Sequence, residues 1–156
     1  MAVVRDVFLV LHVASGGVAL ALGPAVLLGA RRRWGRFREL RDAYHWAVLA
    51  VCATATVVSA LAWGRLWWLV PIAALSYGLA LVGYLGSRRD WPLWMRAHGW
   101  GGSYIALVTA LLVVSTRGAS PALQAVAWGL PAAIGTPLIV RVHSGRRASA
   151  PAALAR

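Results

Sequence analysis

The sequence contains no lysine, only four acidic residues and a single cysteine. Because Cys52 stands alone, the chain forms no internal disulfide and has no cysteine-based metal motif. The acidic residues, Asp6, Glu39, Asp42 and Asp90, all lie in the segments between apolar runs or at the ends of those runs. This placement argues against an ion-coupled transporter with a buried carboxylate and against most enzymes that use paired carboxylates. The sequence also has no phosphate loop and no HExxH motif.

Apolar sequence is abundant instead. Hydrophobic residues make up 60% of the 156 residues, and charged residues make up 13%, about half the share in a typical soluble domain. A soluble domain of this size has too little interior to bury so much apolar surface. About 20 apolar residues cross a bilayer as a helix, and five runs reach that length. The predicted spans are residues 7–30, 44–63, 67–86, 98–116 and 122–140.

A backbone that crosses a bilayer must pair its own polar groups, so the spans are predicted to be helices. We therefore predict an all-α bundle of five transmembrane helices over residues 1–143, followed by a disordered tail over residues 144–156 that is rich in Ala, Ser, Pro and Arg. Pro131 and Pro137 interrupt the fifth run, which predicts a kink or a break there.

The positions of the arginines predict an orientation. Thirteen of the sixteen follow the first, third or fifth run, whereas Arg5, Arg65 and Arg117 lie on the other side. The positive-inside rule then places the N-terminus outside and the C-terminus in the cytoplasm. Exclusive use of arginine together with abundant alanine is typical of a G+C-rich bacterium, so we predict the bacterial cytoplasmic membrane. The net charge of +12 is thus assigned to membrane topology, and no nucleic-acid partner is expected.

The first basic segment has a helical pattern of its own. Trp34, Phe37, Leu40 and Tyr44 recur at helical spacing, with arginines on the other faces. Such a stretch is typical of a short interfacial helix lying on anionic headgroups, and an ordinary basic loop is the alternative. Either structure predicts contact between residues 31–41 and anionic lipid.

Small and weakly polar residues share one face of the first run. His12, Ser15, Gly16, Ala19 and Gly23 follow helical spacing. Faces of this kind turn toward neighbouring helices in membrane bundles. Ionisable residues inside a membrane are candidate functional groups, so this face is one candidate for a small-solute or proton pathway that involves His12.

Two further histidines begin the second and fourth runs. His45 and His98 are predicted to share a depth and to point into the bundle, which is the arrangement of paired axial ligands to a b-type haem. Asp42, one turn before His45, would orient its imidazole. The alternative is that both histidines form hydrogen bonds within the bundle and bind nothing. The remaining members of this predicted pocket are Arg41 and Arg96 for the propionates, Tyr44, Tyr84 and Tyr104 for its polar lining, and Gly99, Gly101 and Gly102 for the space that the ring needs.

Three segments, LHVASGGVALALGP (residues 11–24), HGWGGSYIALVTALLV (98–113) and PAAIGTPLIVR (131–141), resemble small bacterial membrane proteins grouped as domains of unknown function. The resemblance covers most of the chain and implies a bacterial multi-pass membrane protein. The chain also distantly resembles four-helix membrane b-type cytochromes, but those pair histidines at each haem, and His12 has no such partner.

These observations support three functional hypotheses. The leading one is a non-enzymatic scaffold or accessory subunit of a membrane complex, with another membrane protein or a second copy as its partner. The second is an electron-transfer protein with haem b between His45 and His98. The third is the solute or proton pathway that involves His12.

Overall fold

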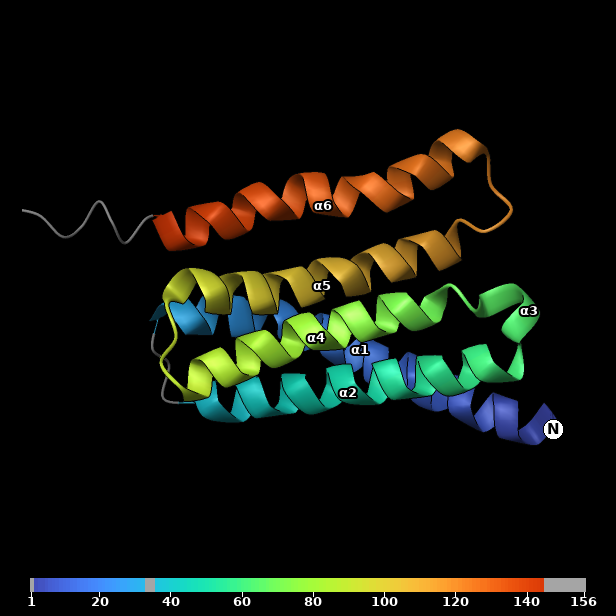
Figure 1. The fold of residues 1–156 in the computed structure, drawn as a ribbon, viewed down its shortest axis with the longest axis horizontal. Helices are drawn as coiled ribbons and strands as arrows, with labels where there is room; N and C mark the ends of the chain where they lie inside the picture. The colour runs from blue at the N-terminus through green and yellow to red at the C-terminus, as the bar shows by residue number, and fades with distance from the viewer. Residues whose placement is uncertain (1, 33–35, 145–156) are drawn as a thin grey trace, which may run out of the picture.

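The computed structural model describes residues 2–32 and 36–144, and within those ranges it contains helices and no strands. Five of the helices are long and apolar enough to cross a membrane, which confirms the predicted all-α architecture with five spans. The predicted disordered tail falls, except for Ser144, outside the described residues. The helices are α1 (Ala2–Arg32), α2 (Phe37–Leu61), α3 (Trp63–Leu66), α4 (Leu69–Arg88), α5 (Leu93–Ser115) and α6 (Pro121–Ser144) (Figure 1).

The helices differ from the predicted spans mainly at their ends. α1 and α2 extend beyond their apolar runs because arginine continues a helix nearly as well as alanine does. The single turn α3, between α2 and α4, was not predicted. α6 continues unbroken through Pro131 and Pro137, so the predicted break is absent from this helix. A proline removes only one backbone hydrogen bond, and neighbouring groups in a membrane bundle satisfy the carbonyl that is left.

No separate interfacial helix precedes the second span in the described residues, because α2 begins at Phe37 and runs straight into the membrane segment. Tyr44 is fully buried, and Phe37 and Leu40 pack against the core cluster. The apolar face of this segment therefore meets other helices, and the predicted contact of residues 31–41 with anionic lipid stays a prediction. Trp34 is outside the described residues.

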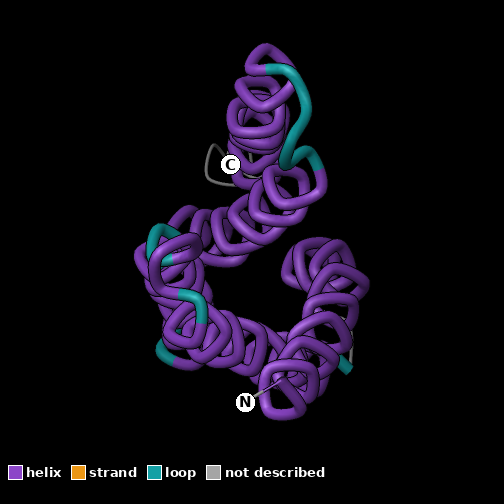
Figure 2. The backbone as a smooth tube through the Cα atoms, turned by 90° about the vertical axis from the view of Figure 1, so that its right-hand side faces the viewer, coloured by secondary structure: helices purple, strands orange, loops and turns teal. Residues whose placement is uncertain are grey.

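The helices pack in an open arc when viewed end-on (Figure 2). α1 packs on α2, α2 on α4, α4 on α5, and α5 on α6, while α1 also reaches α5. α6 thus stands at one end of the arc, with α5 as its principal neighbour. This arrangement gives α2, α4 and α5 the most extensive contacts with the other helices.

Small residues permit the closest approaches between helices, as predicted for the first span. Ala19 is fully buried, Gly16 lies against Val51 of α2, and Gly23 receives the ring of Tyr104 from α5. The predicted inward face of α1 is therefore confirmed at these positions. The backbones of α4 and α5 also approach closely, since a Cβ atom at Gly99 would lie 2.6 Å from the Cα of Gly83.

Candidate functional site: a polar cluster at the basic end

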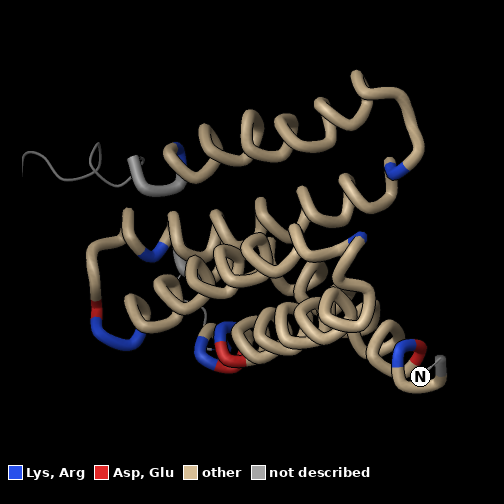
Figure 3. Tube along the Cα trace, turned by 45° about the vertical axis from the view of Figure 1, so that its right-hand side comes forward, with Lys and Arg blue, Asp and Glu red and all other residues tan. Residues whose placement is uncertain are grey.

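One end of the bundle collects most of the described arginines, and we call it the basic end (Figure 3). α2 and α5 begin there, and α4 and α6 end there. Because each helix enters or leaves the bundle at this end, arginines far apart in the sequence come together. They are Arg36, Arg38, Arg41, Arg88, Arg89, Arg96 and Arg141.

Arg41 and Asp42 form the one ion pair described at the basic end. The Nε and Nη2 atoms of Arg41 lie 2.9 Å and 2.8 Å from Oδ1 of Asp42. The side chain of Arg41 is 10% exposed, whereas that of Asp42 is 45% exposed. Asp42 was predicted to orient His45, but its described contacts go to Arg41. Nδ1 of His45 is buried and has no hydrogen-bond partner among the described residues.

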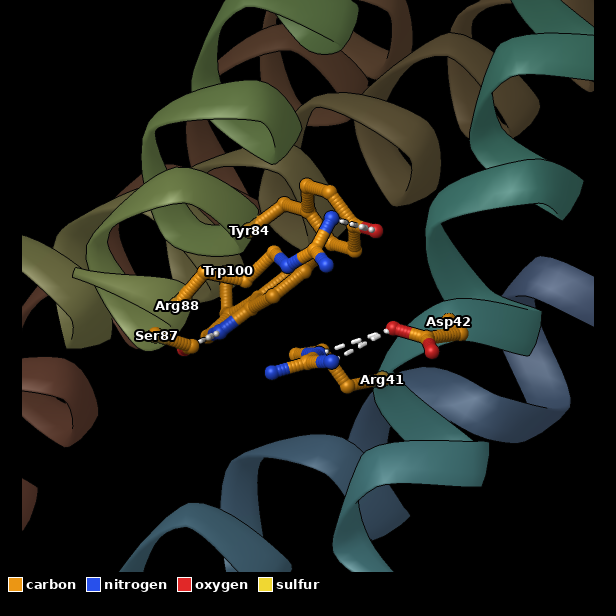
Figure 4. A network of polar contacts seen from close by, with 6 residues as sticks. All are labelled: Arg41, Asp42, Tyr84, Ser87, Arg88 and Trp100. Carbon is orange, nitrogen blue, oxygen red and sulfur yellow. Dashed lines mark hydrogen bonds and ion pairs between the residues drawn. The ribbon is translucent and has the colours of Figure 1, made fainter. Parts of the chain in front are cut away.

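Tyr84 of α4 forms a platform for three cationic or aromatic groups. The ring of His45 stacks on it with centroids 4.1 Å apart and an interplanar angle of 14°. The Cζ atoms of Arg41 and Arg88 lie 5.3 Å and 5.6 Å from the centroid of the same ring, which is within the range of a cation–π contact. Arg88 also donates a hydrogen bond from Nη1 to the Tyr84 hydroxyl at 3.3 Å (Figure 4). This ring therefore links α2 to α4.

A second set of buried contacts joins α2, α5 and α4. Ser103 donates to the carbonyl of Trp100 at 2.9 Å, so the hydroxyl of Tyr44, 3.0 Å from Ser103 Oγ, is the donor in that pair. The indole of Trp100 meets the Tyr44 ring edge-on at 5.5 Å and donates to Ser87 at 3.1 Å. The hydroxyl groups of Tyr44, Ser87 and Ser103 and the indole N–H of Trp100 therefore all have hydrogen-bond partners. Such pairing stabilises polar groups in a bundle interior.

His98 does not join His45 in this cluster. It lies two positions from Trp100, and residues two apart on a helix point about 200° apart. Trp100 faces α2, so His98 faces away from α2. Its Nδ1 lies 2.7 Å from the carbonyl of Trp94 and donates to it. The two histidines therefore do not converge on one pocket.

The space predicted for a haem is occupied by helix packing. Gly99 lies against the backbone of Gly83, Gly102 against Leu79, and Gly101 against Ile139. These glycines bring α5 close to α4 and α6, and the space beside Gly99 and Gly102 is filled by α4. Arg96, proposed for a propionate, packs its Cγ against Gly86, and its Nε is buried without a partner in the described residues. The residues present therefore do not fit a haem between α2 and α5.

His12 contacts α2 on the far side of the bundle. Its Nδ1 lies 3.1 Å from the carbonyl of Val51 and 3.2 Å from the hydroxyl of Thr54. Thr54 itself donates to the Ala50 carbonyl at 2.7 Å, and Ser15 donates to Leu11 of its own helix at 2.7 Å. The described contacts of His12 tie α1 to α2, and they do not extend into a chain of polar groups.

Tyr104 faces a different part of the molecule. Its ring packs on Gly23 and lines a cavity of about 340 Å³ between α1, α5 and α6. Leu27, Val108 and Ile134 are among the apolar residues that complete the wall. The predicted pocket thus divides into the polar cluster of Tyr44 and Tyr84 and this apolar cavity.

Sequence reasoning did not identify Trp100, Ser87 and Ser103 as members of the cluster. The spacing of Trp100 and Ser103 on one helical face was the available signal. No protein-family model matches the sequence, and no curated protein or solved structure is significantly similar to it. The resemblance to small bacterial membrane proteins therefore stays a prediction.

Proposed function

We propose that this chain is a non-enzymatic, multi-pass protein of the bacterial cytoplasmic membrane that acts as a scaffold or accessory subunit of a larger membrane assembly. The observation that carries the proposal is the position of α6. This helix packs principally on α5, and 11% of its apolar span is buried. The span of α1 is equally little buried, but α1 contacts both α2 and α5. A helix held so loosely by its own chain has most of its surface available to another protein.

The two faces of α6 support this assignment. The face toward α5 carries Ala127 and Ile139, both buried, and Gly135, which lies against Ile105. The opposite face carries Ala125, Gly129 and Ala133 at four-residue spacing, and all three are exposed.

Apart from the adjoining backbone of α6 itself, no described atom lies within 4 Å of the Cβ position of Gly129. Membrane helices associate through such small-residue faces, because small side chains let backbones pack closely. A second stripe that the chain itself leaves open suits a neighbouring helix from another subunit.

The proposal includes an orientation. The arginine distribution favours a cytoplasmic basic end and an external N-terminus under the positive-inside rule. In that orientation residues 31–41 approach the anionic inner leaflet, where basic segments are attracted to lipid headgroups.

Photo-crosslinking in membranes tests the subunit role. A photoreactive amino acid at position 129 is expected to give discrete protein adducts, because that face of α6 would meet another subunit. The same residue at position 111 of α5 is the control and is expected to react with lipid, because Leu111 is 50% exposed and its neighbours one turn away, Leu107, Val108 and Val114, are large. Adducts are read by mass on denaturing gels. Equal protein labelling from both positions, or none from position 129, would refute the assignment.

A further inference from the structure

The charge balance of the cluster at the basic end is incomplete. Arg41 pairs with Asp42, whereas Arg88 and Arg96 have no carboxylate within 4 Å among the described residues. Arg41 is 9% exposed as a residue, and the Nε of Arg96 is buried and unpartnered. Arg88 is exposed, so the half-buried cation without a counter-charge is Arg96. A group of cations with so few carboxylates attracts an anion.

The geometry concentrates this charge in one place. The guanidinium groups of Arg41 and Arg88 enter the space between α2 and α4 from opposite sides (Figure 4). Each lies within 6 Å of the centroid of the Tyr84 ring. One nitrogen of Arg41 points away from Asp42 (Figure 4), and the described bonds of Arg88 use Nη1 alone. Both guanidinium groups therefore keep donors for a further acceptor.

A second observation points to a missing ligand in the same cluster. His45 is 6% exposed and stacks flat on Tyr84, yet its buried Nδ1 has no hydrogen-bond partner among the described residues. Buried ring nitrogens are normally paired with a protein group, a water or a ligand. The Tyr84 ring thus contacts two arginines and a histidine whose Nδ1 has no hydrogen-bond partner among the described residues.

We propose that this region, bounded by Arg41, Arg88 and the Tyr84 platform, binds a phosphate group. Arginine suits this role because its planar fork pairs with two phosphate oxygens at once. Stacking on Tyr84 holds the guanidinium groups in place before the ligand arrives. Basic pockets between transmembrane helices bind phosphate-bearing lipid headgroups, and a soluble phosphate compound offers the same chemistry. The site stands apart from α6 and goes beyond the subunit role proposed above.

Binding is measured with the purified full-length protein and three probes: short-chain phosphatidylglycerol, short-chain phosphatidylcholine and inorganic phosphate. Arg88→Gln removes the exposed member of the pair and is expected to weaken binding about tenfold, the loss expected for one charge-assisted contact. Arg117→Gln is the matched control, because Arg117 is also exposed and lies 5.9 Å from the ring centroid of Trp68 at the opposite end. Arg88→Lys keeps the positive charge but loses the planar guanidinium group that contacts two phosphate oxygens at once. This variant is expected to bind with intermediate affinity.

The probes separate the two sources of phosphate. Preference for phosphatidylglycerol over phosphatidylcholine that is lost in Arg88→Gln assigns the site to a lipid headgroup. Binding of inorganic phosphate with the same dependence on Arg88, and no lipid preference, assigns it to a soluble compound. The proposal is overturned if Arg88→Gln binds phosphatidylglycerol and phosphate as the wild type does, or if Arg117→Gln loses as much affinity.

Discussion

Replacing Gly99 with leucine is expected to separate α4 from α5 and to lower the free energy of unfolding by about 3 kcal/mol, the upper part of the range for overpacking. A Cβ atom at this position would lie 2.6 Å from the Cα of Gly83 and 2.9 Å from the carbonyl oxygen of Leu79. Both are backbone atoms, so no side-chain rotation relieves the clash. Thermal unfolding of the purified protein in detergent measures the loss.

Gly78→Ala is the control for this change. Gly78 lies in α4, as Gly83 does. Apart from the adjoining backbone of α4, its Cβ position has no atom of the described residues within 4 Å. The alanine is expected to be neutral or slightly stabilising, because glycine is a poor helix former. Equal unfolding temperatures for Gly99→Leu and Gly78→Ala would contradict the close approach of α4 and α5.

Trp100→Ala is expected to cost roughly 3–5 kcal/mol of stability. The side chain is 1% exposed, fills the contact with Gly83, meets Tyr44 edge-on and donates to Ser87. Its removal forfeits the dispersion contacts of a large ring and leaves Ser87 without its donor. The measurement is again the thermal unfolding midpoint, read by the loss of helical circular dichroism.

Trp94→Ala provides the comparison on the same helix. Trp94 is 52% exposed, so its truncation leaves a much smaller internal gap and is expected to change stability little. Trp100→Phe separates packing from hydrogen bonding, since it retains most of the ring and loses the bond to Ser87. A Trp100→Ala variant as stable as Trp94→Ala would mean that Trp100 does not occupy the junction of α2, α4 and α5.

The five spans were predictable because apolar length alone specifies them. A run such as residues 98–116 needs no knowledge of its neighbours to be recognised as a helix that crosses a bilayer. The single turn α3 was missed because four residues rich in tryptophan and glycine carry no periodic signal. Unbroken helix through Pro131 and Pro137 was missed because the cost of a proline depends on whether surrounding groups satisfy the carbonyl it leaves, and sequence alone does not reveal those groups.

The candidate site was predicted only in part, for a geometrical reason. His45, Arg41, Tyr44 and Tyr84 were named together, and the structure gathers them. His98 was predicted to share their pocket, with Gly102 providing space for the ring. Gly102 instead meets Leu79 of α4, and a helix with several neighbours has several buried faces. Small residues therefore mark a contact without telling which helix makes it.

Topology reporters at successive positions test most directly the central claim, which is a five-span membrane protein with its basic end in the cytoplasm. A cytoplasmic reporter fused after Arg156 is expected to be active, and a periplasmic reporter at the same position is expected to be silent. A periplasmic reporter fused after Ser120, in the loop between α5 and α6, is expected to be active because the proposed orientation puts that loop outside. The opposite pattern, or the same response at both positions, would contradict the orientation or the number of spans.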